Sequence, residues 1–129
     1  VMTNQFYAYE RGTTRFDGKS PLYWDGYVGL MYPSDYGYAA GNSCVTETAP
    51  FNYKGGCKNK DWLYISNTSQ WLMSPRSETP GTVFNVNSSG YVGDYSSINV
   101  FSVRPVFYLT SSTIIDDGEG TLNNPYILK

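Results

Sequence analysis

The stretch NVFSVRPVFYL at residues 99–109 is the longest strand-like run in the chain. Alternate side chains along it form one wholly apolar face and one mixed face, so we expect a strand over residues 100–109. Pro105 has no N–H group to donate, which predicts that this part of the strand lies at a sheet edge or a bulge. Arg104 carries five donors in a planar fork, and we interpret it as a structural clamp on nearby carbonyl or carboxylate groups; the alternative is an anion anchor in a binding site.

Composition restricts both the architecture and the chemistry. With 40% apolar and 17% aromatic residues, the 129 residues can bury one core, so we expect a single domain over residues 1–129. The absence of histidine removes the commonest general base and transition-metal ligand. The net charge is -2, and the only local basic cluster is Lys54, Lys58 and Lys60, which argues against nucleic acid as a partner. No apolar run approaches the roughly 20 residues that span a bilayer, so we expect a soluble chain.

Turn signals divide the chain into short segments rich in Val, Tyr and Phe, which predicts an α+β domain that is mostly β. Residues 82–86, a turn at 87–90 and residues 91–93 together predict a β-hairpin. The other turn dipeptides lie at residues 17–18, 25–26, 55–56, 80–81 and 117–118.

One short helix is predicted in YPSDYGYAAG, residues 32–41. Ser34 can serve as its N-cap, Asp35 suits the first turn, and Gly41 can end it. The three tryptophans have apolar neighbours, and we expect at least two of them in the core; they are Trp24, Trp62 and Trp71.

Two cysteines, Cys44 and Cys57, flank a segment rich in Gly, Asn and Lys. A disulfide between them would close this loop and stabilise the fold by about 3 kcal/mol in the chain-entropy model. We favour the disulfide, and with it an oxidising, extracellular setting, over two unpaired thiols in a cytosolic protein.

Several motifs together resemble a group of domains from gut Firmicutes. The later half carries WLMSP (71–75), VFNVNSSGYV (83–92) and SVRPVFYL (102–109), similar to the pattern W-x-x-S-P, V-x-x-x-G-x-V, G-V-R-P-V. The earlier half adds WDGYVGLMYPSDYGYA (24–39) and DWLY (61–64), and the tail adds GEGTLNNPYIL (118–128). The likeness spans residues 22–128, with two departures: Ser102 replaces a usual glycine, and Met73 a frequent arginine.

The resemblance implies a C-type-lectin-like fold with short antiparallel sheets, one or two short helices and long loops. Such domains form the C-terminal part of prepilin-like and other cell-surface proteins, and are related to formylglycine-generating enzymes and to the variable proteins of diversity-generating retroelements. The resemblance also implies that the Arg104 strand belongs to the central sheet, that Trp71 is structural, and that ligand-binding residues come just before that strand. Carried over by position, these are Asn85, Asn87, Tyr91, Asp94, Tyr95, Ser97, Asn99 and Phe101.

The segment from residue 91 to residue 101 is rich in hydroxyl and amide groups and contains several aromatics. Tyrosine supplies rigid contact area and Ser, Gly and Asn adapt, as in the binding loops of other scaffolds. The alternative is an ordinary solvent-facing connection. Residues 79–118 also lack Lys, Glu, Gln, Trp and Met, which randomised asparagine codons ending in a pyrimidine cannot encode.

Metal and catalytic chemistry find little support in the residues. Asp116, Asp117 and Glu119 are weak candidates for Ca²⁺, but a turn explains them equally well and their spacing is not that of an EF-hand, so we expect no cofactor. For paired catalytic carboxylates Asp17, Asp25, Asp35 and Asp61 are available, but a local turn or cap already accounts for each of them and no pair is preferred. A formylglycine-generating activity would need a late cysteine pair, whereas both cysteines here are early.

The sequence therefore predicts a non-enzymatic, extracellular recognition domain at a cell surface or pilus, with a protein or a glycan as ligand. It could be a diversified variable protein. The alternative is a structural pilin-type subunit whose domain only packs against its neighbours. A pocket holding two close carboxylates would instead favour an enzyme.

Overall fold

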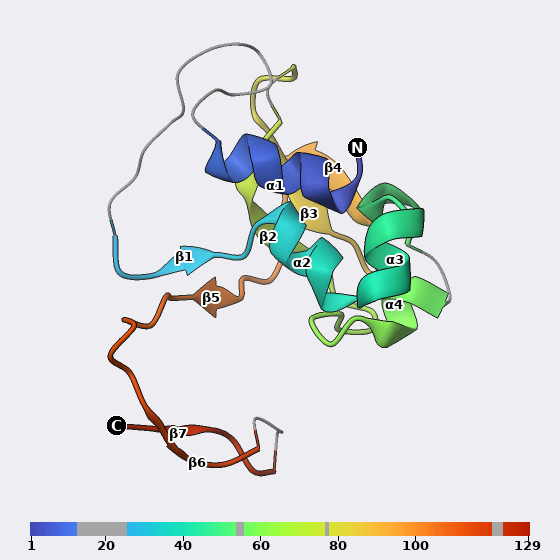
Figure 1. Cartoon of the computed structure of the whole chain (residues 1–129). Helices are drawn as coiled ribbons and strands as arrows, with labels where there is room; N and C mark the ends of the chain where they lie inside the picture. Colours follow the sequence, from blue (N-terminus) through green and yellow to red (C-terminus); the bar gives the residue numbers. More distant parts are fainter. Residues whose placement is uncertain (13–25, 54–55, 77, 120–122) are drawn as a thin grey trace.

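The computed structural model describes residues 1–12, 26–53, 56–76, 78–119 and 123–129 (Figure 1). Its helices are α1 (Thr3–Arg11), α2 (Pro33–Ala39), α3 (Asn42–Glu47), the 3-10 helix η1 (Pro50–Asn52) and α4 (Gly56–Lys60). Its strands are β1 (Gly29–Leu30), β2 (Gln70–Pro75), β3 (Thr82–Val86), β4 (Val92–Ser96), β5 (Pro105–Val106), β6 (Ile115–Asp117) and β7 (Ile127–Leu128). The chain is thus α+β, with small antiparallel sheets and short helices, as the sequence predicts.

The largest sheet is the antiparallel meander β2-β3-β4. Its second half confirms the predicted hairpin: Val86 pairs with Val92, and the turn between them is closed by the N–H of Gly90, which donates to the carbonyl of Asn87 at 2.9 Å. Gly90 has φ +86, a conformation that favours glycine, and a Cβ there would come within 2.8 Å of the Lys58 side chain. The turn at 80–81 is confirmed as well, since Thr82 donates its N–H to Thr79.

The expected continuous strand over residues 100–109 is wrong. Ser102 forms a single parallel bridge to Gln70 of β2, and the next pairing is the two-residue strand β5, which pairs antiparallel with β1. The chain changes partner between residues 102 and 105, so no single ladder can form. Pro105 lies opposite Leu30 in a two-stranded sheet, the edge position that its missing N–H requires. In the described residues β5 pairs with β1 alone, which is not the central-sheet position expected for the Arg104 strand.

Helix α2 confirms the predicted helix but begins earlier. Its N-cap is Tyr32, and Asp35 in the first turn accepts the Tyr32 N–H at 2.8 Å. Ser34 therefore lies inside the helix, and its hydroxyl donates to Glu10 instead of capping the helix. Gly41 follows the C-cap Ala40, with φ +84.

The sequence predicts one or two helices, whereas the described residues form four α-helices. The additional helix α1 lacks a side-chain N-cap and is held by tertiary packing. The Phe6 ring lies 5.5 Å from the rings of both Phe51 and Phe84, and Gly37 approaches Thr3 so closely that a Cβ would come within 2.5 Å of it. Contacts distant in sequence of this kind leave no local signal. Turns predicted at 17–18, 25–26 and 55–56 lie wholly or partly outside the described residues, as do Trp24 and Lys54.

The core lies between the meander and helices α2 and α3. Tyr36 and Tyr53 are fully buried, and each hydroxyl finds a backbone acceptor at 2.8 Å: Gly90 for Tyr36 and Gly37 for Tyr53. These bonds satisfy phenol groups that would otherwise be costly inside a core. The remaining buried apolar residues of this cluster are Met31, Ala40, Cys44, Leu63, Leu72, Val86 and Val92.

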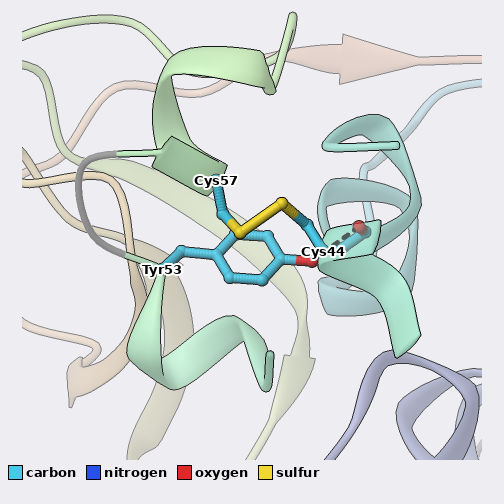
Figure 2. The surroundings of a disulfide bond; sticks show 4 residues. Cys44, Tyr53 and Cys57 are labelled. Atoms are coloured by element: carbon cyan, nitrogen blue, oxygen red, sulfur yellow. Dashed lines mark hydrogen bonds between the residues drawn. A yellow bond between two sulfur atoms is a disulfide. The ribbon is translucent and has the colours of Figure 1, made fainter. Parts of the chain in front are cut away.

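Cys44 of α3 and Cys57 of α4 lie at disulfide distance, with Cα atoms 5.7 Å apart. Figure 2 shows this disulfide beside the ring of Tyr53, whose hydroxyl bonds to α2. The disulfide therefore ties α4 to the core cluster, of which Cys44 is a member. This agrees with the pairing favoured from the sequence.

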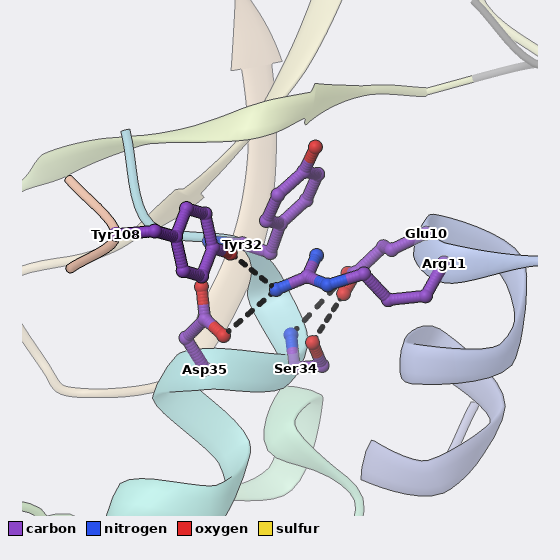
Figure 3. A network of polar contacts seen from close by, with 6 residues as sticks. All are labelled: Glu10, Arg11, Tyr32, Ser34, Asp35 and Tyr108. Carbon is purple, nitrogen blue, oxygen red and sulfur yellow. Dashed lines mark hydrogen bonds and ion pairs between the residues drawn. The ribbon is translucent and has the colours of Figure 1, made fainter. Parts of the chain in front are cut away.

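A polar network ties the end of α1 to α2 and to the segment after β5 (Figure 3). Arg11 donates to Asp35 at 3.2 Å and to the Tyr108 hydroxyl at 2.8 Å, and its guanidinium lies 4.1 Å from the centre of the Tyr32 ring. Beside it, Glu10 accepts the N–H and the hydroxyl of Ser34. Burial raises the pKa of Glu10 to about 7, although the bonds from Ser34 and the charge of Arg11 oppose the shift.

The disulfide gives the first prediction. Replacing Cys44 and Cys57 together by Ala should lower the free energy of unfolding by about 3 kcal/mol, because the unfolded chain then regains the freedom of the closed loop. Urea unfolding of both proteins measures the difference. Reductant should bring the wild type close to the double variant and leave the variant unchanged; equal stabilities in oxidising buffer would contradict a stabilising disulfide.

Stability should also fall as pH rises from about 5 to about 8. Folding raises the pKa of Glu10 from 4.5 to about 7, and burial raises that of Asp61 from 3.8 to about 7. The folded chain therefore binds these protons more tightly, and the stabilisation is full below the unfolded pKa values and lost through about 7. Urea unfolding at several pH values should show this slope, reduced in Glu10→Gln and Asp61→Asn but not in the exposed control Asp116→Asn. A wild-type stability that rises across this range would contradict the prediction.

Candidate functional site

The segment that leaves β4 crosses the surface to the edge of β2 and is fixed at both ends. At one end the Ser97 N–H donates to the Gly81 carbonyl at 2.8 Å. At the other, Ser102 donates to the Ser69 carbonyl at 3.0 Å and accepts from the Trp71 N–H at 2.9 Å. Between these ends Ile98 is 88% and Val100 95% exposed. We define the display surface as Tyr95, near the end of β4, together with four exposed residues of this segment: Ser97, Ile98, Asn99 and Val100.

Three aromatic rings support the display surface. Phe101, which is half-buried, has its ring centre 4.6 Å from that of Trp71 and 5.5 Å from that of Tyr95, the latter edge to face. Such pairs add about 0.5 to 1.5 kcal/mol beyond the area they bury. The stack joins the end of the crossing segment to β2 and β4, so the loop is anchored by side chains as well as by backbone.

A pocket of about 470 Å³ lies next to this stack. We call it the polar pocket, because hydroxyl and amide groups make up most of its lining: Asn67, Thr68, Ser69, Val100, Phe101 and Ser102. The Ser69 hydroxyl is held in place because it accepts the Ser88 N–H at 3.1 Å, and Asn67 has the left-handed backbone conformation, with φ +59. It offers hydrogen-bonding groups beside an aromatic ring, a combination that can orient a hydroxylated or amide-bearing ligand.

Of the residues carried over from the resemblance, Tyr95, Ser97 and Asn99 are exposed, and Tyr91, Asp94 and Phe101 are half-buried. The remaining two are buried, and contacts tie four of the eight to the framework. Asn85 is fully buried, Asn87 is buried with its side-chain oxygen accepting the N–H groups of Ser89 and Tyr91, and Tyr91 packs against the core. Asp94 forms an ion pair with Arg76 at 2.9 Å.

The expectation that Asn85 and Asn87 are displayed is therefore wrong. Alternation in a strand shows which residues share a face but not whether that face is covered. Asn85 lies opposite Trp71 on β2 and Gly93 on β4, and neither polar atom of its amide has a hydrogen-bond partner among the described residues. A buried amide without partners is a cost to the fold.

Arg104 is half-buried near Asp61. Burial raises the pKa of Asp61, while its bond from the Leu63 N–H and the positive charge of Arg104 act in the opposite direction. Among the described residues, one carboxylate oxygen of Asp61 has no hydrogen-bond partner. The interpretation of Arg104 as a clamp stays a prediction.

The tryptophans do not lie where the sequence suggests. Trp62 is 76% exposed and Trp71 is half-buried, so neither is a core residue; their apolar neighbours reflect the strand and turn they belong to. The exposed apolar residues Ile98 and Val100 were missed as site residues, because a Val or Ile in a strand-like segment is usually read as core. Their position next to Asn99 and the turn residues Ser96 and Ser97 was the available signal.

Acidic residues form no metal-binding cluster in the described part of the chain. Asp116 pairs with Lys129 at 3.8 Å and Asp117 accepts the Gly118 N–H, so both are occupied on the exposed β6. No group of three His, Cys, Asp or Glu residues that could hold an ion occurs among the described residues. Asp35 is paired with Arg11 and Asp61 is buried, while Asp17 and Asp25 lie outside the described residues.

Comparison of the chain with protein-family models, curated proteins and solved structures gives no match in any of the three. The resemblance to C-type-lectin-like domains is therefore still a prediction from the motifs. None of the helices in the described ranges is long and apolar enough to cross a membrane.

The orphaned amide of Asn85 leads to a stability prediction. Asn85→Leu, which has nearly the same shape, should raise the free energy of unfolding by about 1 to 3 kcal/mol, because it removes two unpartnered buried polar atoms. Urea unfolding measures this, and Asn123→Leu, at an exposed position, is the matched control with little expected change. Destabilisation by Asn85→Leu would mean that the amide has a partner, such as a buried water.

Proposed function

We propose that this chain is a non-enzymatic, extracellular recognition domain that binds a protein or a glycan through the display surface and the polar pocket. The observation that carries the proposal is the exposed segment itself. Its apolar side chains Ile98 and Val100 project fully into solvent although hydrogen bonds hold the chain at Ser97 and Ser102. Exposed apolar groups on an anchored loop, beside a pocket, are typical of a binding surface.

The chemistry of the surface supports recognition. Tyr95 brings rigid amphipathic area, Ser97 and Asn99 bring adaptable hydrogen-bonding groups, and the polar pocket adds further hydroxyls. Because the loop is held before binding, little conformational entropy is lost when a ligand docks. No nucleic acid is proposed, since the surface carries no basic residue.

The wider setting of the proposal rests on the motifs. A C-type-lectin-like domain, in the C-terminal part of a pilus-like or other surface protein, would carry its ligand-binding residues just before the Arg104 strand. The display surface occupies this position. The cysteine pair supports an oxidising compartment. If the chain is a diversified variable protein, the residues of its display surface differ among copies of the domain.

A structural subunit is the second candidate, and a separate feature favours it. The strands β6 and β7 expose apolar side chains well away from the display surface residues in sequence, among them Ile115 and Ile127. Such a surface is suited to packing against a neighbour. Recognition and packing can therefore be tested on different residues.

The test uses a glycan array and a panel of purified cell-surface proteins, probed with labelled chain. Tyr95→Ala combined with Val100→Ser should lower the binding signal by roughly tenfold or more, the loss of about 1.4 kcal/mol or more. Tyr126→Ala, which removes an equally exposed tyrosine from the C-terminal end, is the matched control and should bind like the wild type. Equal binding by wild type and double variant, or no binding by the wild type to any member of either panel, would contradict the proposal.

A further inference from the structure

A series of contacts leads from the Cys44–Cys57 disulfide to the polar pocket. It begins at α4, a five-residue helix whose residues are all exposed or half-buried. So short a helix is not stable alone in water. The disulfide attaches its second residue to Cys44, a member of the core cluster (Figure 2). The first turn of α4 is therefore held to the rest of the molecule largely by this covalent bond.

Helix α4 in turn packs against the hairpin turn at residues 87–90. Gly90 lies so close that a Cβ on it would come within 2.8 Å of the Lys58 side chain and 3.0 Å of the Tyr64 ring. The Lys58 ammonium lies 5.3 Å from the centre of the same ring. The Gly90 carbonyl accepts the hydroxyl of buried Tyr36 at 2.8 Å. The turn is thus bonded to the core and packed against α4 and the residues that follow it.

The same turn fixes a hydroxyl group of the polar pocket. Tyr64 donates its hydroxyl to the Ser88 carbonyl at 2.9 Å, and the Ser88 N–H donates to the Ser69 hydroxyl at 3.1 Å. Ser69 lines the polar pocket, and its carbonyl accepts the N–H of Ser102, where the segment that carries the display surface ends. Three successive contacts therefore join α4 to the pocket: Lys58 on Tyr64, Tyr64 on Ser88, and Ser88 on Ser69.

We propose that the Cys44–Cys57 disulfide is a redox switch for the polar pocket. With the disulfide closed, α4 is held against the turn, and the turn fixes the Ser69 hydroxyl through Ser88. Reduction frees the first turn of α4, so the hairpin turn loosens and the Ser69 hydroxyl loses its fixed orientation. Because groups that are held before binding lose less entropy when a ligand docks, the oxidised chain is the form that binds tightly. This last consequence rests on the proposed recognition function, whereas the loosening of the turn does not.

The switch works by thiol–disulfide exchange with a dithiol, which is oxidised as the protein is reduced. Cys44 is buried, whereas Cys57 is half-buried. A thiolate of the dithiol therefore attacks the sulfur of Cys57, and the sulfur of Cys44 leaves and takes up a proton. The second thiol of the reagent, as thiolate, then displaces Cys57 and closes a cyclic disulfide. Two electrons and two protons thus pass from the dithiol to the two cysteines.

Backbone order parameters from ¹⁵N relaxation of the full chain test the coupling, because they report motion within the folded state and not the lower stability of the reduced chain. The N–H groups of Ser88 and Gly90 report on the turn. Adding dithiothreitol should lower their order parameters from about 0.85 to about 0.6 or less. The Met73 N–H, which donates to the Met31 carbonyl at 2.9 Å, is the control and should not change.

Two variants separate the disulfide from the contacts that follow it. The chain with both cysteines replaced by Ala should resemble the reduced wild type at Ser88 and should not respond to dithiothreitol. Tyr64→Phe keeps the disulfide but removes the bond to Ser88, so it should loosen Ser88 without reductant; Tyr126→Phe, at an exposed tyrosine, is the matched control. Unchanged order parameters at Ser88 and Gly90 after reduction, an equal fall at Met73, or a Tyr64→Phe chain as rigid as the wild type at Ser88 would each overturn the proposal.

Binding distinguishes the switch from the proposed recognition function. For a glycan or surface protein that the oxidised chain binds in the panels above, dithiothreitol should weaken binding by the wild type about tenfold and leave the double cysteine variant unchanged. Equal affinity of the oxidised and the reduced wild type would overturn the switch and leave recognition intact. If the oxidised chain binds no member of either panel, recognition alone is contradicted, because the order parameters still decide whether the disulfide controls the turn.

Discussion

Two backbone hydrogen bonds at Ser102 set the geometry of the surface on which the account depends. Through them the returning chain is held against the start of β2, between Ser69 and Trp71. That attachment brings Phe101 onto Trp71 and closes one side of the polar pocket. The segment from Ser97 to Ser102 is therefore attached at both ends, and the side chains between these ends project into solvent. Three residues after Ser102 the chain pairs with a different strand, β1.

Local chemistry allowed part of this structure to be predicted. The hairpin over residues 82–96 follows from turn residues and alternation, helix α2 from Asp35 and its neighbours, and the cysteine pair from the loop it closes. What failed depends on contacts distant in sequence. The expected strand over 100–109 is divided because the chain changes its pairing partner. Helix α1 is held by the packing of Phe6 and Thr3 against later elements. Asn85 is buried because both faces of β3 are covered. The position of the exposed segment before residue 102 was therefore predictable, but which side chains it exposes was not.

The molecule separates its two exposed surfaces along the chain. Residues 95–100 present polar and apolar groups on a loop fixed to the meander, whereas β6 and β7 expose mainly apolar side chains such as Ile115 and Ile127. In sequence, Arg104 and β5 lie between residues 95–100 and the C-terminal strands. Arg104 is near buried Asp61, and β5 is paired with β1. The stretch at residues 99–109 is therefore divided: Asn99 and Val100 belong to the proposed recognition surface, whereas Phe101 to Val106 have a framework role.

The central claim is that a framework and a display surface are physically separate within a segment of about ten residues. Saturation mutagenesis of residues 91–101, with protease resistance as the measure of folded protein, tests it most directly. We expect the exposed positions to accept polar and charged residues without loss of folding; these are Ser97, Ile98, Asn99 and Val100. Tyr91, Val92 and Phe101 should require apolar or aromatic residues. If Ile98 and Val100 also require apolar residues for folding, they are covered in the native protein and the segment is not a display surface.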